Sequence, residues 1–528
     1  MFLKSYRFSP RVGFQLSPRQ LQLSRLLSRN IVSSLVQMAF SAGVMFLLYR
    51  YLLARLGPSA LGLWSLVLAT TSTSRVAELG LTASLVRYVS KYSAVCDEES
   101  AREVIETALL TLGCVYGAGL ALAFPGIEWL LRRLIAGADL PTALLLLPFS
   151  LISLWLNVIQ GALASALDGI NRTDIRAGAT VMSNLIFLVC VLILVPRFGL
   201  TGVAIAQIGT SCLAIAVLWP VVVGLFPGLP WFPSRFRLSA LREMLGYGLN
   251  FQAISVIAML FDPITKGFLA HYGGLPLTGY YELASRLVLQ CRSLMIAPSQ
   301  ASIAMISGIS ETESDNIPVV YAATLRAYAF LSTLLYPCLI AAAPLFSYVM
   351  TGAIHPSLIL FIVILSVAWW GNTLSAPAYF INMGTGDIGW NTISHLAIGL
   401  LNTLLGFLCG SFWGAYGVVV GWSLALIIGS SIVNIQYHLK SRISQLAVFP
   451  RESYPLLLAS GIVVFLGWIA YTSVLAGAPA LARSVMLVVV FLLGVALPAW
   501  RHPLRLATLG FLTGSGKVTG HGNDEVVQ

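Results

Sequence analysis

Charged side chains interrupt several stretches of the sequence that are otherwise apolar enough to cross a membrane. A charge at the centre of a membrane-spanning helix costs about 2.5–3.5 kcal/mol on insertion scales, so such residues should face each other or a cavity. Three pairs have the spacing of neighbours on one helix face: Arg75/Glu78, Asp262/Lys266 and Glu282/Arg286. We therefore expect these residues to form ion pairs or to couple an ion to a movement.

The arginines without such a partner point to the binding of an anion. Arg50, Arg292 and Arg326 remain as unpaired positive charge, and Arg292 stands 217 positions after Arg75, the offset of an internal repeat. The planar guanidinium group suits phosphate oxygens better than an ammonium group does. We take Arg75, Arg292, Arg326 and Arg50 as candidates for binding a phosphorylated or otherwise acidic substrate. The alternative for Arg50 and Arg326 is that they extend to the membrane interface from positions near the ends of their spans.

Sequence motifs of the common enzyme classes are absent. There is no intact Walker motif, no His-Glu-x-x-His and no Gly-x-Ser-x-Gly, and the stretch Gly-Ser-Gly-Lys517-Val lacks the Ser or Thr that a phosphate-binding loop needs. The longest outer loop, expected at about residues 125–140, is too short to position catalytic groups. We therefore predict no catalytic residue, no metal site, no cofactor and no enzymatic activity.

Composition places the chain in a lipid bilayer. The sequence has 528 residues, of which 58% are hydrophobic and 10% are charged, and its mean hydropathy is +0.86. Soluble domains are nearer 45–50% apolar and 25% charged. Apolar stretches of about 20 residues, long enough to cross roughly 30 Å of hydrocarbon, predict about fourteen transmembrane helices. The expected fold class is an all-α integral membrane protein.

The spans form two similar halves. Gly57 and Gly62 recur as Gly274 and Gly279, 217 positions later, and the turn that begins at Gly199 recurs at Gly414. Two copies of a six-helix unit favour a transporter, because two lobes can move about a site held between them. The expected division is a basic N-terminal tail (1–29), a first lobe (30–226), a connector (227–245), a second lobe (246–437), a linker with two additional helices (438–500) and a C-terminal tail (501–528).

The distribution of basic residues predicts the orientation. With the N-terminus in the cytoplasm, most of the 31 Lys and Arg residues fall on the inner side or within spans. The outer side holds Arg55, Arg132, Arg133, Arg197 and Arg483. The positive-inside rule then places both termini in the cytoplasm. This sidedness accounts for much of the pI of about 9.4, so nucleic acid is not an expected partner.

The opening of the chain resembles the polysaccharide transporter family, which includes bacterial O-antigen and exopolysaccharide flippases. The likeness is carried by Asn30-Ile-Val-Ser-Ser-Leu, by Arg55-Leu-Gly-Pro58-Ser-Ala-Leu-Gly62-Leu-Trp64-Ser, and by Glu78-Leu-Gly-Leu leading to Arg87. It is firm in motif over residues 30–92 and at the Gly-x-x-Gly turns.

The resemblance implies a flippase of the bacterial inner membrane. Its expected substrate is an undecaprenyl-pyrophosphate-linked oligosaccharide, moved from the cytoplasmic to the periplasmic leaflet, with cavity arginines on the pyrophosphate. Expected partners are this lipid-linked oligosaccharide, membrane lipids and other membrane proteins of glycan assembly. Two alternatives stay open at this stage, namely an ion-coupled multidrug exporter of the same fold and a membrane enzyme of glycan assembly.

Overall fold

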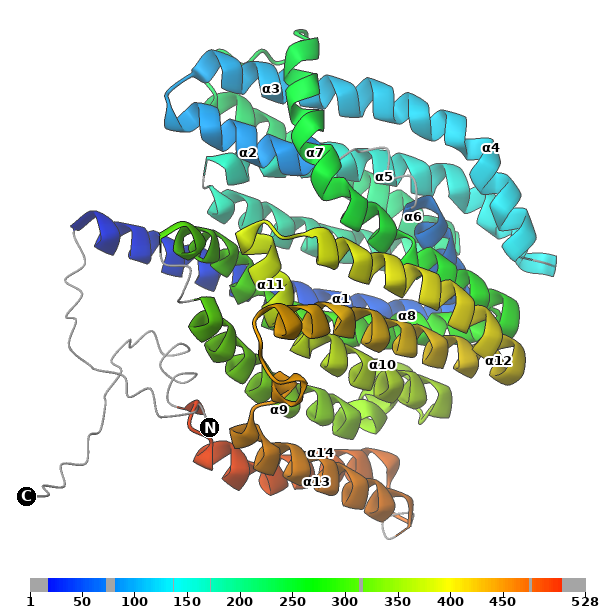
Figure 1. Ribbon diagram of the computed structural model, residues 1–528. Helices are drawn as coiled ribbons and strands as arrows, with labels where there is room; N and C mark the ends of the chain where they lie inside the picture. The colour runs from blue at the N-terminus through cyan, green and yellow to red at the C-terminus, as the bar shows by residue number, and fades with distance from the viewer. Residues whose placement is uncertain are drawn as a thin grey trace, which may run out of the picture.

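The structure is a computed structural model that describes residues 18–72, 81–135, 137–170, 172–312, 317–473 and 477–505. All regular secondary structure in these ranges is helical (Figure 1). The first half of the chain forms α1 (Pro18–Ser72), α2 (Leu81–Ala94), α3 (Glu98–Leu110), a π-helical turn (Thr111–Tyr116), α4 (Gly117–Leu134), α5 (Leu140–Gly169) and α6 (Thr173–Leu225). The second half forms α7 (Leu238–Met259), α8 (Phe261–Thr312), α9 (Ile317–Thr351), α10 (Pro356–Leu374), α11 (Ala376–Thr385), α12 (Gly389–Lys440), α13 (Tyr454–Thr472) and α14 (Ala480–Arg501).

Four of these helices, α1, α6, α8 and α12, double back at a glycine with positive φ, a conformation that L side chains rarely adopt. The glycines are Gly57, Gly199, Gly274 and Gly414. In α1, the rings of Tyr49 and Trp64 lie 6.3 Å apart on opposite sides of the turn. In α8, Lys266 Nζ and Glu282 Oε2 lie 2.8 Å apart across Gly274. Each of these helices is therefore an antiparallel hairpin.

The turn glycines of the two halves have matching backbone angles. Gly57 has φ 78° and ψ 172°, and Gly274 has φ 73° and ψ 176°. Gly199 has φ 56° and ψ −133°, and Gly414 has φ 60° and ψ −144°. The sequence repeat is therefore also a repeat of local structure.

The hairpins α1 and α8 cross where both lack a side chain. A Cβ atom on Gly62 would overlap the carbonyl oxygen of Leu275, and one on Gly279 would overlap that of Pro58. The two contacts are equivalent, because the repeat offset of 217 positions relates Gly62 to Gly279 and Pro58 to Leu275. Glycine at both positions lets the two backbones meet, as small residues do at membrane helix interfaces.

Within the described residues, nine helices or helix runs are long and apolar enough to cross a membrane. The run Thr173–Leu225 and the run Gly389–Lys440 are hairpins, so crossings outnumber helices. The expected total of fourteen stays a prediction, as do the lobe boundaries. The two additional C-terminal helices are present as α13 and α14, and they pack beside α9.

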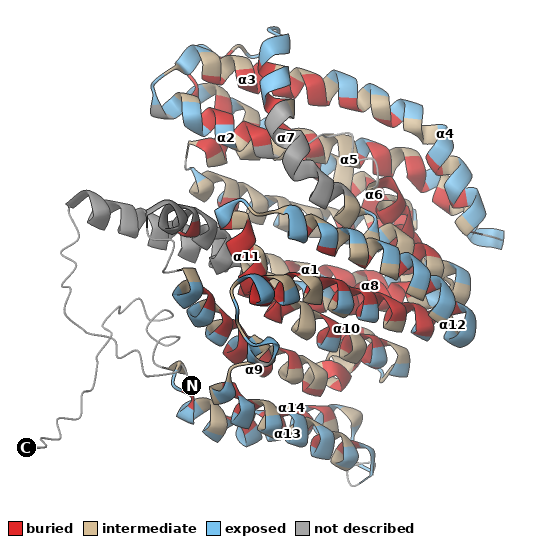
Figure 2. Cartoon of the chain, viewed as in Figure 1, coloured by how far each residue is buried: buried red, intermediate tan, exposed pale blue. Residues whose placement is uncertain are grey.

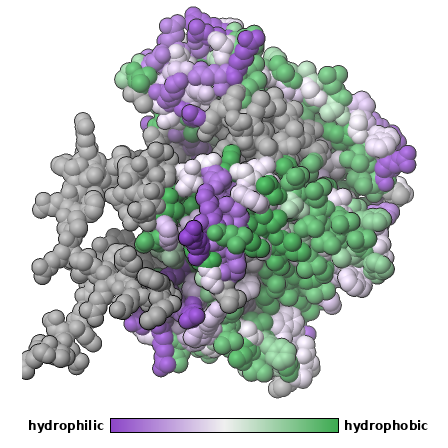
Figure 3. All heavy atoms as spheres, viewed as in Figure 1, coloured by the Kyte–Doolittle hydropathy of each residue, from purple (hydrophilic) through white to green (hydrophobic). Residues whose placement is uncertain are grey.

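Apolar side chains cover much of the outer surface, and the buried residues gather at the centre. Figure 2 shows buried positions concentrated in α1, α8 and α10, whereas α13 and α14 are largely exposed or intermediate. The outward stripe of α12 contains Leu396, Leu400, Leu404, Phe407 and Trp413, all exposed. Figure 3 shows a broad hydrophobic face over this helix, and hydrophilic residues near the ends of α2 and α3. This is the surface of a multi-pass membrane protein.

Two segments expected as loops are partly helical. The stretch expected as the outer loop at about 125–140 is helical to Leu134, because α4 continues beyond the apolar span. The second part of the connector is the start of α7, at Leu238. Its first part is held on α3, where the buried Glu106 carboxylate accepts hydrogen bonds from the backbone N–H groups of Ser234 (2.9 Å) and Arg235 (3.0 Å).

Candidate functional site

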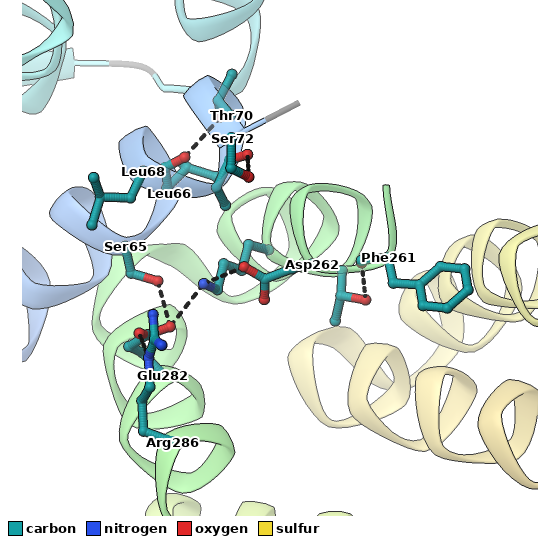
Figure 4. Close-up of polar contacts among 12 residues, drawn as sticks. Ser65, Leu66, Leu68, Thr70, Ser72, Phe261, Asp262, Glu282 and Arg286 are labelled. Carbon is teal, nitrogen blue, oxygen red and sulfur yellow. Dashed lines mark hydrogen bonds and ion pairs between the residues drawn. The ribbon is translucent and has the colours of Figure 1, made fainter. Parts of the chain in front are cut away.

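A buried carboxylate, Glu282, lies at the centre of the molecule and joins both hairpins of the repeat. It accepts hydrogen bonds from Tyr49 Oη at 3.0 Å and from Ser65 Oγ at 2.9 Å, one from each arm of α1. Within α8 it contacts Lys266 Nζ at 2.8 Å and Arg286 Nε at 2.7 Å. Only 4% of its side chain is exposed. Figure 4 shows Ser65 and Arg286 converging on this carboxylate.

Lys266 continues the network to Asp262, whose carboxylate lies 2.6 Å from its ammonium group. Two of the three pairs expected from helical spacing, Asp262/Lys266 and Glu282/Arg286, are thus in contact, and their role in coupling stays a prediction. The pairing of Lys266 with Glu282 across the Gly274 turn was not predicted. These two carboxylates and two cations cancel in charge, which is how buried ions are retained in a medium of low dielectric constant.

The two halves of the repeat contribute different residues to this network. Ser65 and Glu282 are 217 positions apart and bond directly to each other, so they are equivalent residues meeting near the axis that relates the halves. By the same offset, Tyr49 is the equivalent of Lys266. The first half therefore contributes only neutral hydroxyl groups where the second half contributes an ion pair.

A cavity of about 360 Å³ lies beside this network, between α8, α10 and α12. Its wall includes the four charged members of the network and a further cation, Arg292. The guanidinium carbon of Arg292 lies 4.4 Å from the ring centroid of Trp369, a cation–π contact. Among the described residues, Arg292 Nε is buried and has no hydrogen-bond partner. Since the other charges cancel, Arg292 leaves this cavity with a net positive charge.

Aromatic rings form a large part of this wall, beside aliphatic and neutral polar residues. Phe261, Trp369, Trp422 and His395 all line the cavity. The imidazole of His395 stacks on Phe261 with centroids 6.1 Å apart and an interplanar angle of 14°, and Nδ1 has no partner among the described residues. A second pocket of about 250 Å³ shares Arg292 and His395 and extends toward α11. In both pockets the cation Arg292 therefore lies among aromatic side chains.

A different cavity, of about 300 Å³, lies on the other side of the network, toward α1, α5 and α6. It shares Asp262, Lys266, Glu282 and Arg286 with the first cavity. Its remaining polar residues are all neutral: Ser65, Thr71, Ser72, Ser150, Asn157 and Gln207. Arg286, whose side chain is 57% exposed, faces both cavities.

The other candidate arginines from the sequence, and Glu78, lie away from these cavities or outside the residues that the structure describes. Arg75 and Glu78 fall outside the described residues. Arg326 is 55% exposed and pairs with Glu452, before α13, at 3.4 Å. Arg50 is exposed on α1, and neither Arg50 nor Arg326 lines the cavities beside the Glu282 network. Of the four candidate arginines, Arg292 is the one that the described structure places there.

Sequence reasoning missed the neutral and aromatic members of the site. Tyr49 and Ser65 carry a signal in the repeat, because adding 217 to each number gives Lys266 and Glu282. Trp369, Trp422 and His395 have no such signal, since aromatic residues are common in every span. Only the packing of α10 and α12 against α8 brings them to the cavity.

The fold of this chain is similar to solved structures of a lipid II flippase and of multidrug transporters. The lipid II flippase MurJ in an inward closed conformation superposes with a TM-score of 0.70 at 15% identity, covering 89% of this chain and 98% of that one. An inward-facing multidrug resistance MATE transporter of the MOP superfamily gives a TM-score of 0.65 at 15% identity, with coverages of 78% and 95%. A MOP superfamily transporter from Pyrococcus furiosus gives 0.59 at 14% identity, with coverages of 80% and 96%. The chain is therefore a multi-pass membrane protein with the fold of the MOP superfamily.

The sequence itself identifies the family. Residues 27–310, more than half of the chain, match the model of the family described as polysaccharide biosynthesis protein. The chain belongs to this family. No curated protein sequence is similar enough to count as a match.

Proposed function

We propose that the protein is a flippase that moves undecaprenyl-pyrophosphate-linked oligosaccharide from the cytoplasmic to the periplasmic leaflet of the bacterial inner membrane. Membership of the polysaccharide biosynthesis family supports a glycan substrate, and the MOP fold supports transport rather than chemistry on it. The observation that carries the proposal is Arg292, a cavity cation whose Nε has no hydrogen-bond partner among the described residues. Such a group is suited to an anionic ligand such as pyrophosphate.

The arrangement of the site supports alternating access. Glu282 receives donors from α1 and cations from α8, so it holds the two halves together in this conformation. A rocking movement of one half against the other would separate Glu282 from Tyr49 and Ser65, while Lys266 and Arg286, which belong to the same helix as Glu282, stay beside it. The polyprenyl tail remains in lipid, and only the polar head enters the cavity. Both termini are proposed to be cytoplasmic.

A multidrug exporter is the second candidate, because a MATE transporter shares the fold. The cavity charge argues against it. Organic cations are attracted to a cavity with excess carboxylate, whereas this one has excess guanidinium. A catalytic role in glycan assembly has less support, since the described loops between helices are short.

The proposal is tested by measuring lipid-linked oligosaccharides in cells that lack the gene and in cells complemented with variants. Wild type and Arg50→Gln should restore completed repeat units to the periplasmic side, because Arg50 lies outside these cavities. Arg292→Gln should leave the repeat units on the cytoplasmic side, although the protein is present at the wild-type level. Unchanged lipid levels without the gene, together with altered sensitivity to toxic cations, would instead identify an exporter.

A further inference from the structure

The cavity bordered by α1, α5 and α6 contains amide and hydroxyl groups that the protein does not use. Gln207 makes no side-chain hydrogen bond with the described residues, and neither does Ser150, which is 3% exposed. Asn157 donates from Nδ2 to the Ser153 carbonyl at 2.7 Å, which leaves its Oδ1 atom available. Polar groups in a partly buried wall are costly unless they find partners. This set therefore points to a ligand.

We propose that this cavity binds the sugar residue attached to the pyrophosphate, and that it selects the substrate by the sugar's hydroxyl or acetamido groups. This inference rests on the flippase function proposed above and goes beyond it by assigning a separate subsite. Asn and Gln each offer donors and an acceptor, which matches the hydroxyl groups of a sugar. A site built to hydrogen-bond such groups rejects ligands that lack them, since its own polar atoms then stay unpaired.

The contrast between the two cavities supports this division. The cavity on the α12 side combines Arg292 with aromatic rings and has a net positive charge. Apart from the shared network, the polar side chains that line the cavity on the α5 side are all neutral. Pyrophosphate is best accommodated by the first and an uncharged sugar by the second. At about 300 Å³, the second cavity is at the lower end of ligand pockets, which span roughly 300–1,000 Å³, so it suits one sugar rather than a whole repeat unit.

The two cavities adjoin each other, so one ligand can reach both. Asp262, Lys266, Glu282 and Arg286 line each of them. Arg286 donates a hydrogen bond from Nε to Glu282, while its largely exposed side chain lines both cavities. A pyrophosphate between Arg286 and Arg292 would therefore place its attached sugar beside Asn157 and Gln207.

The test compares two lipids in one sample: undecaprenyl pyrophosphate, and the same lipid carrying one N-acetylglucosamine. Native mass spectrometry of the purified full-length protein in detergent resolves the two bound forms by mass. The ratio of glycosylated to bare lipid is independent of the fraction of folded protein. Asn157→Leu/Gln207→Met removes both amides at similar volume. Gln160→Met is the matched control, since Gln160 is half-buried on α5 and does not line this cavity.

Wild type and Gln160→Met are expected to prefer the glycosylated lipid, and the double variant should lower this ratio at least tenfold. An unchanged ratio in the double variant would overturn the sugar subsite, and so would equal binding of the two lipids by wild type. The flippase proposal has its own readout in the same experiment, because Arg292→Gln should weaken the binding of both lipids. If wild type binds neither lipid, or Arg292→Gln binds the bare lipid as wild type does, the flippase proposal itself fails.

Discussion

Removing the charge of Glu282 should destabilise the protein mainly by taking one of two carboxylate partners away from a buried lysine. Glu282→Gln keeps the shape of the side chain but leaves Lys266, whose side chain is 3% exposed, with Asp262 as its carboxylate partner. Breaking a buried ion pair by removing one partner costs about 3–5 kcal/mol. Because Asp262 still neutralises Lys266 and Arg286 has access to water, we expect the lower end, a loss of about 3 kcal/mol.

The assay is the free energy of unfolding in mixed detergent micelles, measured by far-ultraviolet circular dichroism. A second substitution, Lys266→Met, removes the buried cation that has lost this partner, and replacing a buried ion pair by apolar side chains is often neutral. Glu282→Gln/Lys266→Met should therefore recover at least half of the loss. The matched control is Glu452→Gln, which breaks the exposed pair with Arg326 and should change stability by at most about 1 kcal/mol.

The reasoning is refuted if the losses from Glu282→Gln and Lys266→Met simply add in the double variant. Additive losses would mean that the two charges do not compensate each other in the folded protein. A loss for Glu282→Gln no larger than that for Glu452→Gln would likewise show that water reaches this network and screens it.

Three further changes test other contacts. Gly62→Ala should prevent the hairpins α1 and α8 from meeting, because its Cβ would overlap the Leu275 backbone. We expect aggregated protein on size-exclusion chromatography, whereas Gly43→Ala, where a Cβ meets open space, should behave as wild type. Glu106→Gln should weaken two charge-assisted hydrogen bonds to the connector by a total of about 2 kcal/mol. Faster cleavage near Ser234 in limited proteolysis would show this weakening, and an unchanged cleavage rate would contradict it. Tyr49→Phe removes one donor to Glu282 and should lower the unfolding free energy by about 1.5 kcal/mol, while Tyr51→Phe, with a 3.5 Å exposed contact, should have no measurable effect.

The sequence predicted the parts of the fold that depend on local patterns. Apolar span length gave the helices, and the recurrence of Gly57 and Gly199 predicted turns that the structure shows at Gly274 and Gly414. Spacing of three or four residues predicted the ion pairs within α8, because such neighbours meet on any helix. The extra turns of α4 escaped prediction because Arg132 and Arg133 lie beyond the apolar span, where hydropathy carries no signal for helix.

The site was predictable only for residues that break an apolar pattern. Arg292 and Glu282 stand out because a charge in a membrane span is costly and therefore rare outside functional positions. His395 and Trp422 belong to α12 and reach the cavity only through the packing of α12 against α8. Gln207 and Asn157 are polar without charge, and membrane spans contain such residues for packing as well as for binding.

The meeting of Ser65 with Glu282 has a consequence for how the chain arose by duplication. In an ancestral dimer of identical six-helix subunits, this position would face its own copy. Two glutamates there would place like charges together in a buried setting, which strongly disfavours ionisation of both. Two serines would leave Lys266 with Asp262 alone and would take from Arg286 the carboxylate that it contacts. Joining the two copies in one gene allowed each to change separately, so the two halves of this protein are no longer interchangeable.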